Sequence, residues 1–152
     1  MESPVRREVV VKAAPERAFA AFTEVPELLA WLADGAVVGR RVGGNWALGW
    51  YADEDSDAGY HVLGTFEVFE PGSRIVVGGV RFSTPEGEAW EGMRLTVAFE
   101  PADGGTRVTV AQEGVGQGPA WDGYAAGLGP GWERALADLR AWLEEGRKLP
   151  GR

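Results

Sequence analysis

The sequence contains no cysteine, and His61 is its only histidine. The absence of cysteine excludes disulfide bonds, thiolate nucleophiles and sulfur-ligated metal sites, and it is typical of proteins from a reducing compartment. Long apolar runs are missing too. No stretch approaches the roughly 20 residues that a membrane-spanning helix requires, and the first residues lack the apolar region of a signal peptide. The sequence therefore predicts a cytoplasmic protein without membrane insertion.

Positive charge is scarce as well. Lys12 and Lys148 are the only lysines, and the formal net charge at pH 7 is -8. Nucleic-acid backbones and anionic membrane surfaces attract proteins through a basic stripe that displaces counterions. The charge of this chain therefore predicts no nucleic-acid partner.

What the chain does have is sufficient length and many large apolar side chains. Its 152 residues can bury a substantial core without crosslinks, so we expect a single domain over residues 1–152. Seven tryptophans and six phenylalanines supply bulky groups for that core. Full burial of one aromatic side chain contributes on the order of 2 to 3 kcal/mol, so most of them are expected to serve stability.

The apolar periodicity changes along the chain. A first strand, expected to be buried, covers about residues 6–12, and proline at an early helical position then opens short helices at Pro15 and Pro26. Five more strands are predicted at about residues 41–51, 60–70, 73–82, 90–100 and 105–113. A last helical region follows, with a break or kink at residues 129–131 and a final helix from about 132 to 145.

Short turns indicate how the strands pair. Leu95, Val97 and Phe99 alternate with more polar residues, and the turn at residues 101–105 leads directly into another alternating strand. Such links join antiparallel neighbours, because parallel pairs need a crossover of a dozen or more residues. Apolar residues then recur at helical spacing, at Trp132, Ala135, Leu136, Leu139, Trp142 and Leu143. We therefore predict an α+β fold in which a C-terminal helix covers an antiparallel meander.

Few residues carry obvious chemistry. His61 is a candidate general base, but no Gly-x-Ser-x-Gly motif accompanies it, so we interpret it as a histidine at the start of a strand. The acidic run at residues 53–57 begins like a calcium-binding loop, yet the required glycine is displaced and Gly64 stands where the bidentate glutamate belongs. The sequence therefore predicts no catalytic residue, no metal and no cofactor.

Several short motifs occur in a characteristic order. They are Ala-Pro-Glu-Arg-Ala-Phe at residues 14–19, Leu-Leu-Ala-Trp at 28–31, Gly-Gly-Asn-Trp at 43–46, Gly-Thr-Phe-Glu-Val at 64–68, Gly-Gly-Thr-Arg-Val-Thr-Val at 104–110, and Gly-Trp at 131–132. Together they cover nearly the whole chain. The chain resembles bacterial proteins related to the activator of the heat-shock protein 90 ATPase, within the START-like, helix-grip (SRPBCC) superfamily. The resemblance implies a curved antiparallel sheet wrapped around a long C-terminal helix, with an elongated apolar cavity between them.

The resemblance implies much less about activity, because relatives of this fold include lipid and hormone carriers, polyketide cyclases and co-chaperones. Our leading hypothesis is that the cavity binds a small hydrophobic or amphipathic ligand such as a lipid. One alternative is a polyketide cyclase-like or hydrolase-like enzyme that acts on an aromatic substrate. Another is a stress-related co-chaperone or protein-interaction module. A homodimer and a chaperone partner stay open.

The residues expected to bind the ligand lie on the elements that the resemblance places around the cavity. They are Trp31, Trp46, Phe66, Phe82, Trp90, Arg94, Tyr124, Leu128 and Trp132. Arg81 and Arg94 stand within strand-like segments. A guanidinium there either reaches the mouth of the pocket, where it would bind a carboxylate or phosphate, or faces outward.

Overall fold

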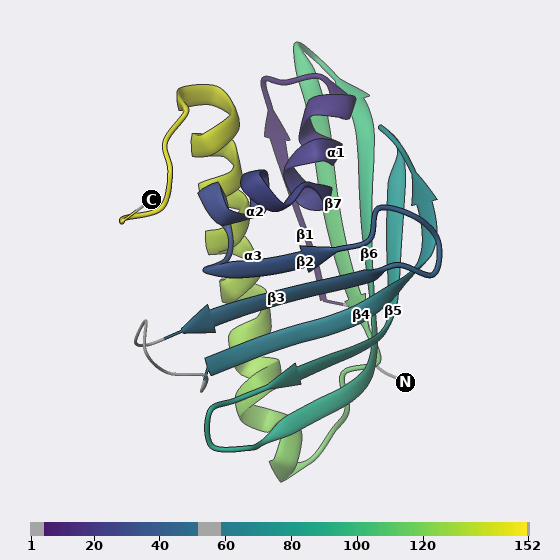
Figure 1. Ribbon diagram of the computed structural model, residues 1–152, viewed down its shortest axis with the longest axis vertical. Helices are drawn as coiled ribbons and strands as arrows, with labels where there is room; N and C mark the ends of the chain where they lie inside the picture. Colours follow the sequence, from purple (N-terminus) through teal and green to yellow (C-terminus); the bar gives the residue numbers. More distant parts are fainter. Residues whose placement is uncertain (1–4, 52–58, 152) are drawn as a thin grey trace.

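The computed structural model describes residues 5–51 and 59–151. These residues form the elements β1 (Val5–Val11), α1 (Pro15–Thr23), α2 (Val25–Trp31), β2 (Gly35–Val38), β3 (Asn45–Tyr51), β4 (Gly59–Glu70), β5 (Arg74–Ser83), β6 (Ala89–Ala102), β7 (Gly105–Glu113) and α3 (Pro119–Glu145). The strands make one antiparallel sheet in the order β1-β7-β6-β5-β4-β3-β2. Figure 1 shows α3 running along this sheet. The predicted α+β helix-grip fold is confirmed.

The sheet is strongly bent. In Figure 1 strands β2, β3 and β4 run across the view, whereas β1, β6 and β7 run along it. Irregular pairing marks the bend, both in β4 and between Val77 and Val80 of β5. Gly79 lies within the irregularity of β5, and Gly92 of β6 lies at the next one, where the partners of Val80 and Phe82 are Met93 and Trp90. Their φ angles of 57° and 77° are a backbone conformation that glycine adopts without strain. The bend gives the sheet a concave face.

The short helices fill one end of that concave face. Pro15 and Pro26 lie in the first turns of α1 and α2, where proline costs no helical hydrogen bond. Phe19 and Phe22 of α1 are buried in the core, as is Trp31 of α2. Helix α1 contacts β6 and β7, and α2 contacts α3. This end of the molecule is therefore solidly packed.

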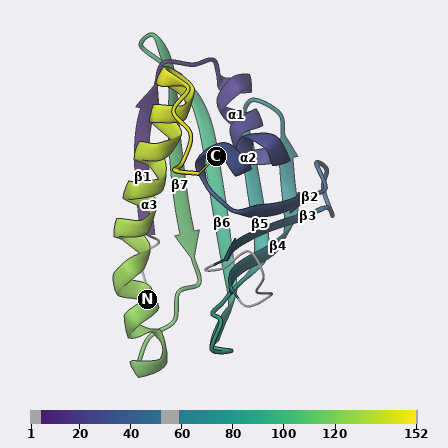
Figure 2. The same cartoon turned by 60° about the vertical axis from the view of Figure 1, so that its left-hand side comes forward.

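Helix α3 differs between its two halves. Its buried residues are Gly129, Leu136 and Leu139, so no residue of its first ten positions is fully buried. The second half packs on the core and ends at Gly146, whose φ of 66° is typical of a left-handed C-cap. Figure 2 shows the helix standing to one side of the sheet along its full length. The space that is not filled by core residues therefore lies beneath the first half of α3.

Three details of the predicted order are corrected. The strand β2 was not predicted, and it forms the sheet edge beside β3. The first strand is not buried: it is the opposite edge, and of its residues only Val11 is fully buried. Of the break or kink predicted at residues 129–131, the break is wrong, because α3 continues through Pro130. Among the described residues, no helix is both long and apolar enough to cross a membrane.

Candidate functional site

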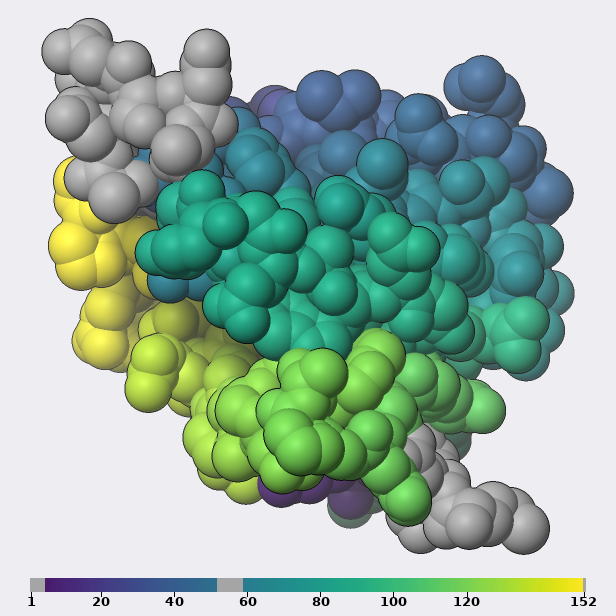
Figure 3. Space-filling view, turned by 90° about the horizontal axis from the view of Figure 1, so that it is seen from below, coloured from purple at the N-terminus to yellow at the C-terminus, as the bar shows by residue number. Residues whose placement is uncertain are grey.

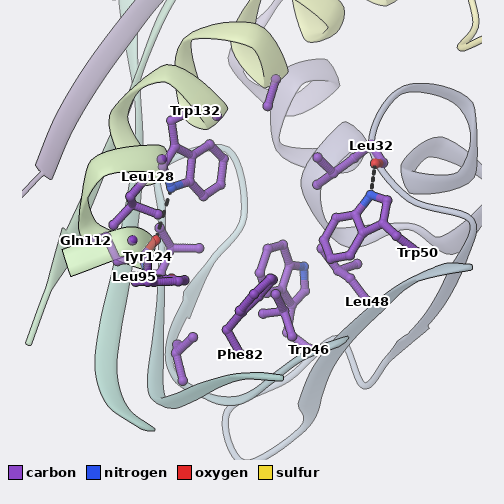
Figure 4. Close-up of a pocket in the computed structure, with 16 residues that line it drawn as sticks. Leu32, Trp46, Leu48, Trp50, Phe82, Leu95, Gln112, Tyr124, Leu128 and Trp132 are labelled. Atoms are coloured by element: carbon purple, nitrogen blue, oxygen red, sulfur yellow. Dashed lines mark hydrogen bonds between the residues drawn. The ribbon is translucent and has the colours of Figure 1, made fainter. Parts of the chain in front are cut away.

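A cavity of about 390 Å³ lies between the first half of α3 and the concave face of the sheet. Its lining consists of Leu32, Trp46, Leu48, Trp50, Val62, Val80, Phe82, Leu95, Gln112, Gly123, Tyr124, Gly127, Leu128, Gly131, Trp132 and Ala135. Figure 4 shows the side chains of α3 on one side of the space and those of β3 on the other. This volume is within the range of about 300 to 1,000 Å³ that is typical of small-molecule sites.

Two indole rings of β3 form the wall opposite the helix. The Trp46 Nε1–H donates to the carbonyl oxygen of Phe22 at 2.8 Å, and the Trp50 Nε1–H donates to that of Leu32 at 2.7 Å. Both carbonyls belong to helix ends, where no further helical N–H is available. The rings are therefore fixed in orientation, and their N–H groups are already used when they face the cavity.

Glycines form the helical border of the cavity. Gly123, Gly127 and Gly131 recur every four residues, so they lie on one face of α3. All three line the cavity and are also exposed, so they lie where the cavity meets solvent. A Cβ atom added at any of them would meet no heavy atom within 4 Å. The opening of the cavity therefore exists because these positions carry no side chain.

The polar part of the lining is a single buried amide with its partners. Gln112 of β7 is 5% exposed, and it faces inward from a strand whose other inward residues are apolar or small. Its Oε1 accepts the indole N–H of Trp132 at 3.0 Å. Its Nε2 donates to the Tyr124 hydroxyl oxygen at 2.8 Å and to the Met93 sulfur at 3.2 Å. These bonds join β7 to α3 across one corner of the cavity.

Tyr124 is the one titratable group of the described lining. Burial raises the pKa of its phenol above the ordinary 10.0, and the hydrogen bond from Gln112 opposes that rise. The phenol is therefore protonated throughout the neutral range.

An aromatic cluster closes the end of the cavity near the start of α3. The rings of Trp90 and Tyr124 stack at 5.2 Å with an interplanar angle of 23°, and Phe82 lies 5.3 Å from Tyr124. The Trp90 Nε1–H donates to the carbonyl oxygen of Ala120 at 2.6 Å. Figure 3 shows the hairpin between β5 and β6, in teal, lying directly against the beginning of α3, in green. Trp90 thus fastens this hairpin to the helix.

The structure brings together five of the nine residues that were expected to bind a ligand. Trp46, Phe82, Tyr124, Leu128 and Trp132 line the cavity. The other four lie elsewhere. Trp31 and Phe66 are 1% exposed and belong to the core, and Trp90 lies behind Tyr124 and Phe82.

Arg94 lies on the outer face of the sheet. Its Nε donates to Glu67 Oε1 at 2.8 Å, and Arg81 pairs in the same way with Glu91 at 3.0 Å. Both arginines face outward because the alternation of their strands turns Leu95 and Phe82 inward. His61 is also outside the cavity, in a depression on the outer face, where its ring lies 5.7 Å from that of Tyr51.

Sequence reasoning missed most of the remaining lining. A signal was present for Gln112, because it continues the inward alternation of Thr106, Val108 and Val110 and has a larger polar side chain than any of them. A signal was also present in the four-residue spacing of the glycines. No local pattern could have identified Leu32 or Val62, because their position depends on the bend of the sheet.

Among the described residues, no group of three His, Asp or Glu side chains is close enough to hold a metal ion. The acidic run at residues 53–57, interpreted above as a solvated loop, lies outside the described residues.

A bent antiparallel sheet that holds a long C-terminal helix over an apolar cavity defines a START-type, SRPBCC fold. Residues 12–144 match the family described as Activator of Hsp90 ATPase homolog 1-like protein, and the chain belongs to this family. The predicted resemblance is therefore confirmed. None of the curated proteins compared with the chain matches it.

Solved structures agree with this assignment. A protein from Chromobacterium violaceum is 26% identical, with a TM-score of 0.69, and the match covers 94% of this chain and 99% of that one. The Aha1 dimer from Colwellia psychrerythraea is 18% identical, with a TM-score of 0.73 and coverage of 95% and 98%. DynU16, from the dynemicin biosynthetic locus, is 20% identical with a TM-score of 0.73, over 97% of this chain and 49% of DynU16. The last two show similarity of fold.

Proposed function

We propose that this protein binds one small apolar or amphipathic molecule in the cavity beneath the first half of α3. The observation that carries the proposal is the cavity itself, which is lined almost entirely by apolar side chains and bordered by three glycines with open space at their Cβ positions. Each 100 Å² of apolar ligand surface that leaves water contributes about 2.5 kcal/mol, so a molecule that fills this space gains most of its affinity from burial.

The rigid walls of the cavity support its interpretation as a binding site and not as a loosely packed part of the core. The indoles of Trp46 and Trp50 are held by hydrogen bonds to helix ends, and Trp132 is held by Gln112. A ligand therefore meets a preformed surface and spends little free energy on ordering side chains.

The lining favours binding over catalysis. Among the described lining residues there is no serine, threonine, histidine, lysine or carboxylate that would act as nucleophile or general base. An enzyme acting on an aromatic substrate would need a group such as a histidine, a tyrosine or an arginine to polarise a carbonyl. Of His61, Arg81, Arg94 and Tyr124, only Tyr124 faces the cavity. His61, Arg81 and Arg94 are on the outer face.

A variant with a larger side chain at the border of the cavity tests the proposal. Gly127→Leu places a side chain in open space at the border of the cavity, and Ala126→Leu places the same side chain on the exposed surface one residue away. Native mass spectrometry of freshly purified protein should detect a co-purifying small molecule with the original chain and with Ala126→Leu. We expect Gly127→Leu to retain at most about a tenth of it, which corresponds to a loss of about 1.4 kcal/mol. Equal retention by both variants contradicts the proposal, and so does an original chain that carries no molecule and also binds no added apolar probe.

A homodimer and a chaperone partner are separate predictions, supported by the family and by the dimeric neighbour from Colwellia psychrerythraea. Light scattering during size-exclusion chromatography measures the first. The ATPase rate of the bacterial chaperone, with and without this protein, measures the second, and an unchanged rate removes it.

A further inference from the structure

We propose that the ligand is an uncharged molecule with an aromatic or similarly flat apolar body and one hydrogen-bond acceptor, such as a ketone or ester carbonyl, which accepts a hydrogen bond from the Tyr124 hydroxyl. This inference rests on the proposed function and specifies the class of molecule for the same cavity.

The orientation of the Gln112 amide is determined by its neighbour. Indole nitrogen is a donor only, so the atom of Gln112 that faces the Nε1–H of Trp132 must be the oxygen. The amide nitrogen therefore faces Tyr124 and donates to its hydroxyl oxygen at 2.8 Å. Tyr124 is the acceptor in this bond, so its own proton is not used there.

The other donors of the lining side chains are all occupied. The indole protons of Trp46, Trp50 and Trp132 go to Phe22, Leu32 and Gln112 respectively. The two amide protons of Gln112 go to Tyr124 and Met93. Among the described lining residues, the hydroxyl of Tyr124 is therefore the one side-chain donor that has not been used.

The hydroxyl stands at the wall of the cavity. Tyr124 and Gln112 both line the space, and the bond between them runs along the corner where α3 meets β7. The phenol keeps its proton at neutral pH, and burial raises its pKa further above the ordinary 10.0. A donor without an acceptor in an apolar environment is costly, so a ligand that supplies an acceptor gains both the hydrogen bond and the relief of that cost.

The charge around the cavity excludes an acid as the favoured ligand. No described lining residue is charged, and the nearby strand residues Arg81 and Arg94 pair with glutamates on the outer face. A carboxylate or phosphate inside would lose its hydration without gaining a cation. Phe82 and Tyr124 both line the cavity, with their rings 5.3 Å apart, and these rings favour a flat ligand body against which they can stack.

Three related probes test this inference by isothermal titration calorimetry. They are 2-acetylnaphthalene, 2-isopropenylnaphthalene, in which a methylene group replaces the carbonyl oxygen, and 2-naphthoate, which is anionic. We expect the ketone to bind about fivefold more tightly than the isopropenyl compound, as one neutral hydrogen bond predicts, and the anion to bind most weakly. Tyr124→Phe should abolish the fivefold preference, because it removes the hydroxyl that donates to the carbonyl. The matched control Tyr51→Phe alters a tyrosine on the outer face and should retain the preference.

A second readout does not depend on affinity. The carbonyl stretching frequency of bound 2-acetylnaphthalene should be lower with the original chain than with Tyr124→Phe, since a donated proton weakens the C=O bond. If both neutral probes bind equally well to the original chain, or if Tyr124→Phe keeps the preference, the inference is wrong while the proposed function stands. If neither neutral probe binds and no molecule co-purifies, the proposed function itself fails.

Discussion

Individual indole groups explain why the helix ends and the cavity wall are rigid. The last carbonyls of a helix lack a helical partner and need another donor. In α1 these donors are tryptophans: Trp31 donates to Ala21 at 2.8 Å and Trp46 donates to Phe22 at 2.8 Å. Each indole thus joins a helix end to a neighbouring element. The tryptophans bury apolar surface and also supply hydrogen bonds to carbonyls at the end of α1.

The first prediction concerns Trp31. Trp31→Phe removes the donor and leaves the carbonyl of Ala21 without its partner, so we expect a loss of about 1 to 3 kcal/mol in the free energy of unfolding. Urea denaturation measures this loss. Because Trp31 does not line the cavity, the affinity for 2-acetylnaphthalene should not change. Trp121→Phe, whose indole donates no hydrogen bond to a described residue, serves as the control and should cost less.

The second prediction concerns the pH dependence of stability. The folded-state pKa of Tyr124 is raised, mainly by burial, above the ordinary 10.0. The contribution of Tyr124 to stability is therefore fully present below pH 10.0 and is lost as the pH rises through the folded-state pKa. Urea denaturation from about pH 8 to about pH 11 should show the original chain losing stability faster than Tyr124→Phe. Parallel curves for the two proteins would show that the phenol is not buried from water.

At the scale of elements, α3 shows how tertiary contacts override local preference. Gly129, Pro130 and Gly131 predict a break, yet the helix continues and both glycines keep negative φ angles. Gly129 is buried where a Cβ atom would overlap the guanidinium of Arg7 in β1. This glycine therefore leaves room for the Arg7 guanidinium beside the helix. The packed second half of α3 compensates for the hydrogen bond that Pro130 cannot donate.

The third prediction compares glycines within this helix. Gly127→Ala adds a methyl group in open space and removes a flexible residue, so it should raise the free energy of unfolding by about 0.5 to 1 kcal/mol. Gly129→Ala should raise the free energy of unfolding by a smaller amount or lower it, because the added methyl group displaces Arg7 and disturbs the ion pair of Arg7 with Glu133. Thermal denaturation of both variants measures the difference. A smaller gain for Gly127→Ala than for Gly129→Ala would contradict the assignment of open space.

Most elements were predictable from the sequence because their patterns are local. Alternation in β6 and β7, short turns and prolines at helix starts each depend on neighbouring residues only. Strand β2 was missed because its four residues, Gly35–Val38, are too few to show a period. The exposure of β1 was missed because an edge position follows from the order of strands, which three consecutive valines do not reveal.

At the scale of the whole molecule, one half is packed and the other is hollow. The half around α1, α2 and the end of α3 contains the large buried rings, whereas the cavity lies under the start of α3. Five of the nine residues expected to bind a ligand line the cavity, because they lie on β3, β5 and α3, which enclose it. Trp31 and Phe66 could not be separated from them, since core and cavity residues have the same chemistry and differ only in how the bent sheet divides the space.

The fourth prediction follows from this division. Saturation with 2-acetylnaphthalene at about 100 times its Kd should stabilise the protein by about 2.7 kcal/mol. Amide hydrogen exchange should slow mainly in the first half of α3, which has few buried contacts, and hardly change near Leu136 and Leu139. Equal slowing of exchange along the whole helix would show that the ligand does not stabilise mainly the first half of α3.

The glycine border of the cavity also bears on how such proteins diverge. The three glycines lie at the border of the cavity, and a Cβ atom at any of them would meet neither the sheet nor the core within 4 Å. Replacing any of them by a larger residue reshapes the opening and, if anything, favours the helix. If the proposed function holds, single substitutions at these three positions would change which molecule is bound without lowering the stability of the fold, so a new specificity would need no compensating mutation elsewhere.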